Sequence, residues 1–239
     1  MVGDSNLRDF HRGINVKCQF MPGGTVLHGM VHFFNNPTIV EGRTVIAILL
    51  GTNNVSCSVQ EPDAILEEFK LLLSYLKQLV RGSGTKVLVM GLPPRADDIR
   101  LNQKGKEVNM RLQRLCKTMG VAFDQTYRTL NKMGNTRSLN MTGHYPGLHV
   151  TKEGKEAIAQ RLRIAAVHTV TSACTGCKNI EGCQRCKGWI KHGPKELTEE
   201  IAKPQKSELQ ELFPEWCYHL IHFLGGERIH VVNARDLRY

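Results

Sequence analysis

Apolar and polar positions alternate along the first 170 residues in two patterns, one typical of buried strands and one of amphipathic helices. Short apolar runs, the first of them rich in β-branched residues, predict strands at 44–50, 86–91 and 121–123. Apolar positions near helical spacing predict helices at 62–80 and 104–119, and a Thr151 cap predicts a helix from there to about residue 170. This order of elements predicts an α/β fold with a parallel sheet covered on both faces.

Length and composition describe an ordinary soluble globular protein. The chain has 239 residues, of which 41% are hydrophobic and 23% charged, so it can bury a large core. Its longest apolar stretch, residues 45–50, has the length of a buried strand and falls far short of a membrane span. No signal peptide is visible, because the Gly3-Asp4-Ser5 turn follows Met1 almost at once. The sequence therefore predicts a cytoplasmic or nuclear protein.

The net charge of +10 is unevenly distributed. Residues 1–173 hold 22 Lys and Arg against 13 Asp and Glu, whereas residues 174–239 hold 10 against 9. The basic surplus thus belongs to the α/β part. It is consistent with solubility alone, since the basic residues are scattered, or with attraction to phosphate groups and anionic surfaces.

Four short motifs carry residues that acyl-transfer chemistry needs. They are Gly3-Asp4-Ser5, Pro22-Gly23-Gly24-Thr25, Gly51-Thr52-Asn53-Asn54 and Leu148-His149-Val150-Thr151. A serine hydroxyl is a weak nucleophile at neutral pH, so it needs an imidazole to remove its proton. Ser5 and His149 are the candidates for these two roles. Backbone N–H groups and a side-chain amide from the middle motifs are candidate donors to an oxyanion.

In this order and spacing the four motifs resemble the SGNH (GDSL-like) hydrolase family, over roughly 70% of the chain. The resemblance implies a three-layer α/β domain over 1–170 and a serine esterase or acylhydrolase acting on a small ester. It assigns the nucleophile to Ser5 and the general base to His149. It assigns the oxyanion to the Ser5 N–H, the Gly23 N–H and the Asn53 side-chain amide, with Gly24 as the alternative to Gly23.

Two features depart from the family pattern. The family's nucleophile follows a buried strand, but only Met1 and Val2 precede Gly3, so we expect that first strand to be missing or the chain to be truncated. The family's third catalytic residue, an aspartate three positions before the histidine, corresponds here to Pro146. The sequence therefore predicts a Ser–His dyad of weakened activity, because the aspartate normally orients the imidazole.

Further segments, around 90–95 and 109–116, are similar to the SGNH domains of some animal non-LTR retrotransposons. The branch that resembles platelet-activating-factor acetylhydrolases shares the Gly-Thr-Asn-Asn motif as well. Basic charge and a cysteine module favour the retrotransposon group. A non-catalytic SGNH-like module that binds RNA or DNA is the alternative function, and a decayed element without function is a third.

A cysteine-rich tail over 171–239 follows the hydrolase-like part. Its cysteines form two Cys-x-x-Cys pairs, Cys174 with Cys177 and Cys183 with Cys186. Two such pairs can complete a closed tetrahedral zinc site, so the sequence predicts a structural zinc and no metal in catalysis. Disulfides, free thiols and an iron–sulfur cluster are the alternatives.

Overall fold

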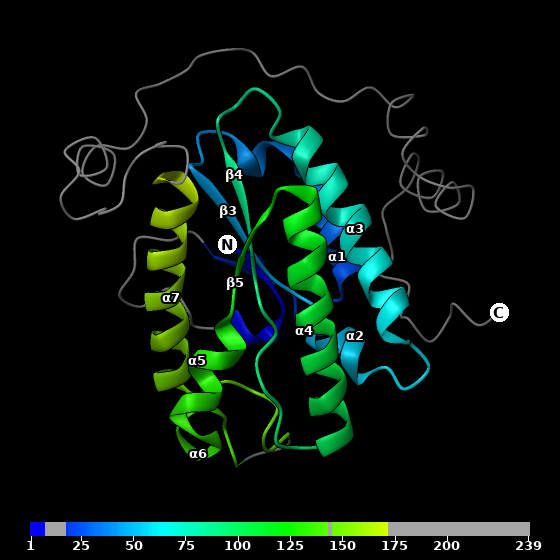
Figure 1. The fold of residues 1–239 in the computed structure, drawn as a ribbon, viewed down its shortest axis with the longest axis vertical. Helices are drawn as coiled ribbons and strands as arrows, with labels where there is room; N and C mark the ends of the chain where they lie inside the picture. The colour runs from blue at the N-terminus through cyan, green and yellow to red at the C-terminus, as the bar shows by residue number, and fades with distance from the viewer. Residues whose placement is uncertain (8–17, 143–144, 172–239) are drawn as a thin grey trace. The chain divides into compact units, whose positions relative to one another are not determined.

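A parallel sheet of five strands lies at the centre of this computed structural model, which describes residues 1–7, 18–142 and 145–171 (Figure 1). The strands are β1 (Val2–Gly3), β2 (Gln19–Phe20), β3 (Val45–Leu49), β4 (Lys86–Met90) and β5 (Ala122–Asp124), in the order β2-β1-β3-β4-β5. Every neighbouring pair is parallel. The predicted α/β fold with a parallel sheet is therefore confirmed.

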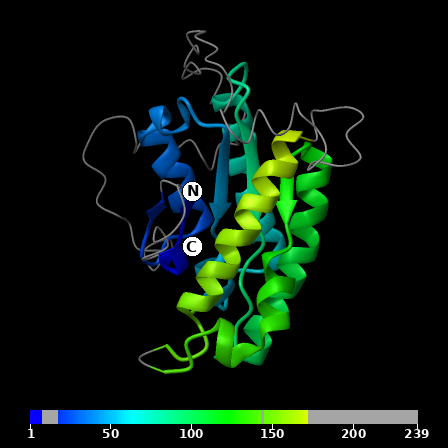
Figure 2. The same cartoon turned by 90° about the vertical axis from the view of Figure 1, so that its left-hand side faces the viewer.

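Helices cover both faces of the sheet. They are α1 (Val26–Asn35), α2 (Thr52–Ser56), α3 (Pro62–Leu79), α4 (Ile99–Met119), α5 (Thr126–Met133), α6 (Asn135–Ser138) and α7 (Lys152–Thr171), with 3-10 turns η1 (Ser5–Leu7) and η2 (Pro37–Val40). In Figures 1 and 2, α7 lies on one side of the sheet and α1, α3 and α4 on the other. The helices and the sheet thus form three layers.

Alternate residues of β3 point into two hydrophobic cores. Ala47 and Leu49 belong to the core beneath α7, together with Leu88 and Met90 of β4. Their neighbours Ile46 and Ile48 are buried as well. A strand buried on both faces is apolar throughout, which is why residues 45–50 form a continuous apolar run.

The strand before the Ser5 turn is present, although it has only two residues. Val2 of β1 pairs with Gln19 of β2 on one side and with Ile48 of β3 on the other. The prediction that this strand is missing is therefore wrong. Two residues are too few to give an apolar run in the sequence, but the strands on both sides supply the pairing.

Most predicted elements are confirmed, and the exceptions have local causes. α4 begins at Ile99, five residues earlier than predicted, because the Asp98 side chain accepts the N–H groups of Arg100 and Leu101 as an N-cap. α1 was not predicted; it begins after Thr25, which forms a capping box with His28. Among the described helices, none is both long and apolar enough to cross a membrane.

The carboxyl ends of the strands meet at one edge of the sheet, where the motifs gather. β2 and β3 lie on opposite sides of β1, so the strand order changes direction beside β1. In open parallel sheets, ligands bind outside the carboxyl ends at such a switch point. The Ser5 turn leaves β1 at this place, and the asparagine motif leaves β3 next to it.

Candidate active site

The turn that carries Ser5 is fixed to strand β3 by its backbone. The Asp4 N–H donates to the Leu49 carbonyl at 3.1 Å, and the Asp4 Oδ1 accepts the Asn6 N–H at 2.9 Å. Gly3 approaches β3 so closely that a Cβ there would lie 2.5 Å from the Leu49 oxygen, which explains the glycine. Ser5 itself is partly exposed at the start of η1.

Asp4 is fully buried behind this turn. Burial raises the pKa of its carboxyl above the ordinary value, while hydrogen bonding with Asn6 and Thr52 opposes the shift. Its carboxylate thus caps the turn that presents Ser5.

His149 immediately precedes Val150, which forms a short antiparallel bridge with Leu139. On this bridge the His149 carbonyl accepts the Asn140 N–H at 2.6 Å. The Tyr145 ring stands edge-on to the half-buried imidazole, with 6.1 Å between ring centroids. These contacts fold the loop that precedes α7 onto itself around His149.

One hydrogen bond joins the His149 loop to the Ser5 turn. The Val150 N–H donates to the Asn6 Oδ1 at 3.2 Å, although 144 positions separate the two residues. The residue after His149 therefore contacts the residue after Ser5. The structure thus brings these two predicted site residues to the same place.

The second and third motifs also meet there. The Asn53 Nδ2 donates to the Gly24 carbonyl at 2.9 Å, which leaves its second amide hydrogen for another acceptor. Gly23 is exposed, with a left-handed φ of 70°. The Gly24 N–H is used inside the turn, where it donates to the Met21 carbonyl at 2.9 Å. Of the two glycines, Gly23 is thus the better placed to donate its N–H to a ligand.

Sequence reasoning missed two side chains that hold these motifs together. Asn54 is buried, and its Oδ1 accepts the Val26 N–H at 3.0 Å, while its Nδ2 donates to Glu68. The sequence signal for Asn54 was its place beside Asn53 in the motif. Glu68 has no local signal, because it lies in the middle of α3 and reads as one polar position among several.

An ion pair after β4 was missed as well. Arg95 is buried, and its Nε and Nη2 donate to the two Asp97 carboxylate oxygens at 3.0 and 2.5 Å. Its Nη1 donates to the Ser56 Oγ at 2.5 Å, which connects the pair to α2. Partial burial acts to raise the pKa of Asp97, but the hydrogen bonds and charge of Arg95 outweigh it and lower that pKa.

The same segment contacts the loop that carries His149. The Ala96 N–H donates to the Gly147 carbonyl at 2.9 Å, and a Cβ on Gly147 would lie 2.7 Å from the Asp97 nitrogen. Pro146, the position of the usual family aspartate, is exposed. Asp97 is therefore a carboxylate whose backbone adjoins this loop, but its oxygens are bound by Arg95.

Two cavities lie at the amino ends of the strands, on the side of the sheet opposite the candidate site. One of about 510 Å³ is lined by Lys86 and Ala122 at the beginnings of β4 and β5, and one of about 270 Å³ by Val2 and Val45 of β1 and β3. They are remote from the carboxyl ends of the strands. The candidate site lies at the carboxyl ends and includes neither cavity.

The predicted zinc ligands Cys174, Cys177, Cys183 and Cys186 lie outside the described residues. Within residues 1–7, 18–142 and 145–171, no group of three or more His, Cys, Asp or Glu side chains could hold a metal ion. Cys18, Cys57 and Cys116 are free thiols. The zinc site therefore remains a prediction from the sequence.

The fold and the order of the motifs define an α/β protein of the SGNH hydrolase type. The model of the family described as GDSL-like Lipase/Acylhydrolase matches residues 4–162, and the chain belongs to this family. A search of curated proteins found no match.

Solved structures share the fold. They include a GDSL-like lipase from Bacteroides thetaiotaomicron, which is 20% identical, with a TM-score of 0.53 over 69% of this chain and 85% of that one. The lipase/acylhydrolase from Enterococcus faecalis is 18% identical, with a TM-score of 0.52 over 69% and 94%. A catalytic mutant of an acetylxylan esterase from Geobacillus stearothermophilus is 13% identical, with a TM-score of 0.50 over 67% and 77%. At these identities the likeness concerns the fold.

Proposed function

We propose that the chain is a serine esterase that hydrolyses small carboxylic esters with a Ser5–His149 dyad. The Ser5 hydroxyl attacks the ester carbonyl, while His149 takes its proton and passes it to the departing alcohol. Water then attacks the acyl–Ser5 ester with His149 as the base, which frees the acid and restores Ser5. The observation that carries the proposal is the hydrogen bond from Val150 to Asn6, which joins the two segments.

Donors around the Ser5 turn support the second part of this mechanism. The negative oxygen of the tetrahedral intermediate needs hydrogen-bond donors that are already in place. The Ser5 N–H, the Gly23 N–H and the free hydrogen of the Asn53 amide are the proposed donors. The hydrogen bond from Asn53 to Gly24 supports this set, because it connects the segments that carry two of the three.

Pro146 supports a dyad of reduced efficiency rather than a triad. An orienting carboxylate fixes the imidazole tautomer and stabilises the imidazolium, and its loss from a serine protease costs about 10⁴-fold in turnover. A backbone carbonyl can take over the orienting role. We therefore propose slow turnover and no metal or cofactor in catalysis.

Hydrolysis of p-nitrophenyl acetate tests the proposal. The wild type should release p-nitrophenol faster than buffer does, and Ser5→Ala and His149→Ala should each return the rate to a residual supported by the oxyanion donors alone. Ser58→Ala is the matched control, since Ser58 is exposed in the loop after α2. Equal rates for the wild type and Ser5→Ala would refute the esterase.

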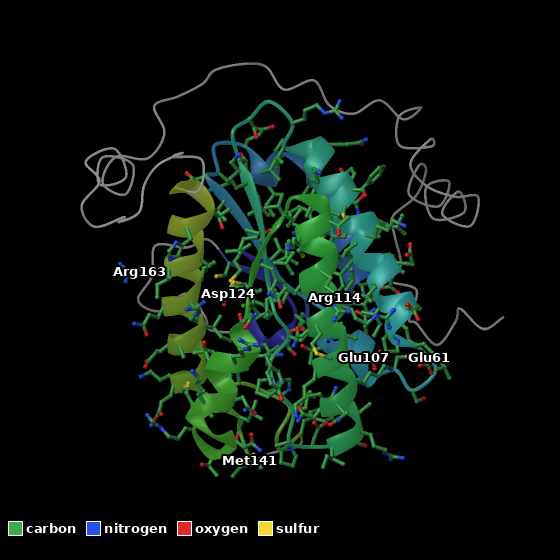
Figure 3. The ribbon with its side chains drawn as sticks, viewed as in Figure 1. Glu61, Glu107, Arg114, Asp124, Met141 and Arg163 are labelled. Carbon is green, nitrogen blue, oxygen red and sulfur yellow. The ribbon has the colours of Figure 1, made fainter. Side chains whose placement is uncertain are left out.

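We further propose nucleic-acid binding as a second candidate function, because the basic surplus is confined to one part of the domain. Residues 1–98 hold nine Lys and Arg against nine Asp and Glu, whereas residues 99–171 hold 13 against four. The latter form α4 to α7, of which α4 and α7 flank the edge strand β5 (Figure 1). Figure 3 labels two exposed arginines of this part, Arg114 on α4 and Arg163 on α7.

Binding to labelled RNA and DNA oligonucleotides at several salt concentrations tests this second function. Affinity should fall steeply with salt, because each phosphate that the protein neutralises releases a counterion. Arg114→Glu with Arg163→Glu should weaken binding, while Arg81→Glu, an exposed change on the neutral half, should not. Ser5→Ala should bind as well as the wild type. Absent or salt-insensitive binding would exclude this function.

A further inference from the structure

Glu68 of α3 is linked to both segments that carry proposed oxyanion donors, to one directly and to the other through Asn54. Its Oε2 accepts the Asn54 Nδ2 at 2.7 Å, from the motif that contains Asn53. Through this amide Glu68 is linked to the start of α1, where the Asn54 Oδ1 accepts the Val26 N–H at 3.0 Å, just after the glycine motif. Its Oε1 accepts the Gln60 Nε2 at 2.5 Å. One carboxylate thus joins three elements.

Both asparagines of the third motif bind at the second motif or at the residue that follows it, and one of them also binds Glu68. Asn54 receives the Val26 N–H on its Oδ1, so its amide must be oriented with Nδ2 toward Glu68. The adjacent Asn53 donates to the Gly24 carbonyl. The orientation of Asn54 therefore sets how α2 sits against the start of α1, and with it the distance between Asn53 and Gly23.

A charged side chain at the position of Glu68 costs more free energy than one on the protein surface would. Most of its surface is removed from water, and among the described residues no ion pair includes it. Burial accordingly raises the pKa of Glu68, opposed by the hydrogen bonds from Asn54, Gln60 and Leu27. The start of α1 adds a favourable field, because helix N-termini stabilise anions. A half-buried carboxylate beside a site, with no ion pair among the described residues, is a functional candidate.

We propose that Glu68 is a positioning residue, which holds the Asn53 amide and the Gly23 N–H at the spacing that an oxyanion requires. It touches neither substrate nor Ser5 and acts through Asn54. This inference rests on the esterase proposed above and adds a residue to it that none of the four motifs contains. A neutral amide at position 68 offers one acceptor oxygen in place of two and faces its own N–H donors toward Gln60 or Asn54.

Glu68→Gln and Glu67→Gln form the matched pair for the test. Glu67 is the preceding residue on the same helix, and its side chain is 62% exposed in a pair with Lys70. Glu68→Gln should lower kcat for p-nitrophenyl acetate by about 10- to 100-fold with little change in KM, because transition-state stabilisation is lost while ground-state binding is retained. Glu67→Gln should match the wild type. Equal kcat for both variants would overturn the proposal, as would a raised KM at unchanged kcat.

A double-mutant cycle separates positioning from a general loss of stability. Asn53→Ala should lower kcat by about 10²- to 10³-fold, as loss of one oxyanion donor does. Adding Glu68→Gln should then cost less than about a further twofold, since residues that act through one another are not additive. Effects that multiply would overturn the proposal. Glu68→Asp, which keeps the charge, should recover part of kcat, and it replaces Glu68→Gln in the cycle if the latter fails to fold.

NMR of the Asn53 side-chain amide tests the positioning role of Glu68 independently of enzyme activity. Its ¹⁵N–¹H signals are identified by their loss in Asn53→Ala. They should shift in Glu68→Gln and stay in place in Glu67→Gln. Unmoved signals overturn the positioning role. If the wild type hydrolyses no ester, only the esterase proposal is refuted. The shift of these signals still establishes or refutes the coupling between Glu68 and Asn53.

Discussion

The Asn6 side chain accepts the backbone N–H of Val150 at 3.2 Å and donates to the Thr52 Oγ1 at 3.5 Å. Asn6 follows Ser5, Val150 follows His149, and Thr52 precedes Asn53. A single amide thereby contacts the neighbours of the proposed nucleophile, base and oxyanion asparagine. Because Asn6 is buried, water does not compete for these two hydrogen bonds.

Replacing Asn6 tests this connection. Asn6→Ala leaves the buried Val150 N–H without its acceptor, which should cost about 1–3 kcal/mol of unfolding free energy. Turnover should fall further than stability predicts, because the His149 loop loses its link to the Ser5 turn. Urea denaturation and ester hydrolysis measure the two effects. Asn131→Ala, at an exposed position of α5, is the control and should change neither. Unchanged turnover in a folded Asn6→Ala variant would show that the link is dispensable.

Restoring the family carboxylate should improve the site. We expect Pro146→Asp to raise kcat, because an aspartate there can orient His149 and stabilise its protonated form. Pro146→Asn is the matched control, since it makes the same backbone change, including loss of the fixed φ of proline, without the charge. Comparison of kcat for the two variants isolates the carboxylate. No gain from Asp over Asn in soluble, folded protein would mean that another group already orients the imidazole.

The Arg95–Asp97 pair should make stability depend on pH in the acid range. The pKa of Asp97 is lowered in the folded protein, so its ionised form favours folding. This contribution is present above the ordinary carboxyl value of about 3.9 and is lost as the pH falls through the lower folded value. Urea midpoints between about pH 6 and about pH 3 should therefore fall less steeply for Asp97→Asn than for the wild type.

A control and a second variant sharpen this measurement. Glu41→Gln, at an exposed position, should follow the wild-type pH dependence. Arg95→Met should destabilise the protein by about 1–3 kcal/mol at neutral pH, because it removes the hydrogen bonds to Asp97 and Ser56, while water still reaches the Asp97 carboxylate. If Asp97→Asn and the wild type run parallel at all pH values, the ion pair contributes nothing to folding.

The cysteine-rich tail should bind about one zinc per chain through four thiolates. Metal analysis of protein purified under reducing conditions measures the stoichiometry. Cys174→Ser with Cys183→Ser should abolish binding, whereas Cys57→Ser, in the described domain, should not. Removal of the metal by a chelator should leave ester hydrolysis unchanged, since a closed thiolate site offers no position for water. A metal-free tail would exclude this prediction.

Several parts of this protein were determined by local sequence. The apolar run of β3, the amphipathic stripe of α3 and the left-handed Gly120 that ends α4 could all be predicted, because each follows from periodicity or from the conformation of one residue. The four motifs could be identified for the same reason, since each is a run of three or four consecutive residues. Their order along the chain was enough to indicate the family.

Other parts were decided only by tertiary structure. Val2–Gly3 becomes a strand because β2 and β3 offer hydrogen bonds on both sides, which no property of two residues can foretell. Asn6 receives Val150 across 144 positions, and Glu68 reaches Asn54 from the middle of another helix. A hydrogen bond forms only when the donor and acceptor lie within a few tenths of an ångström of the preferred distance. Such distances arise when helices pack on a sheet, and the sequence contains no periodic signal for them.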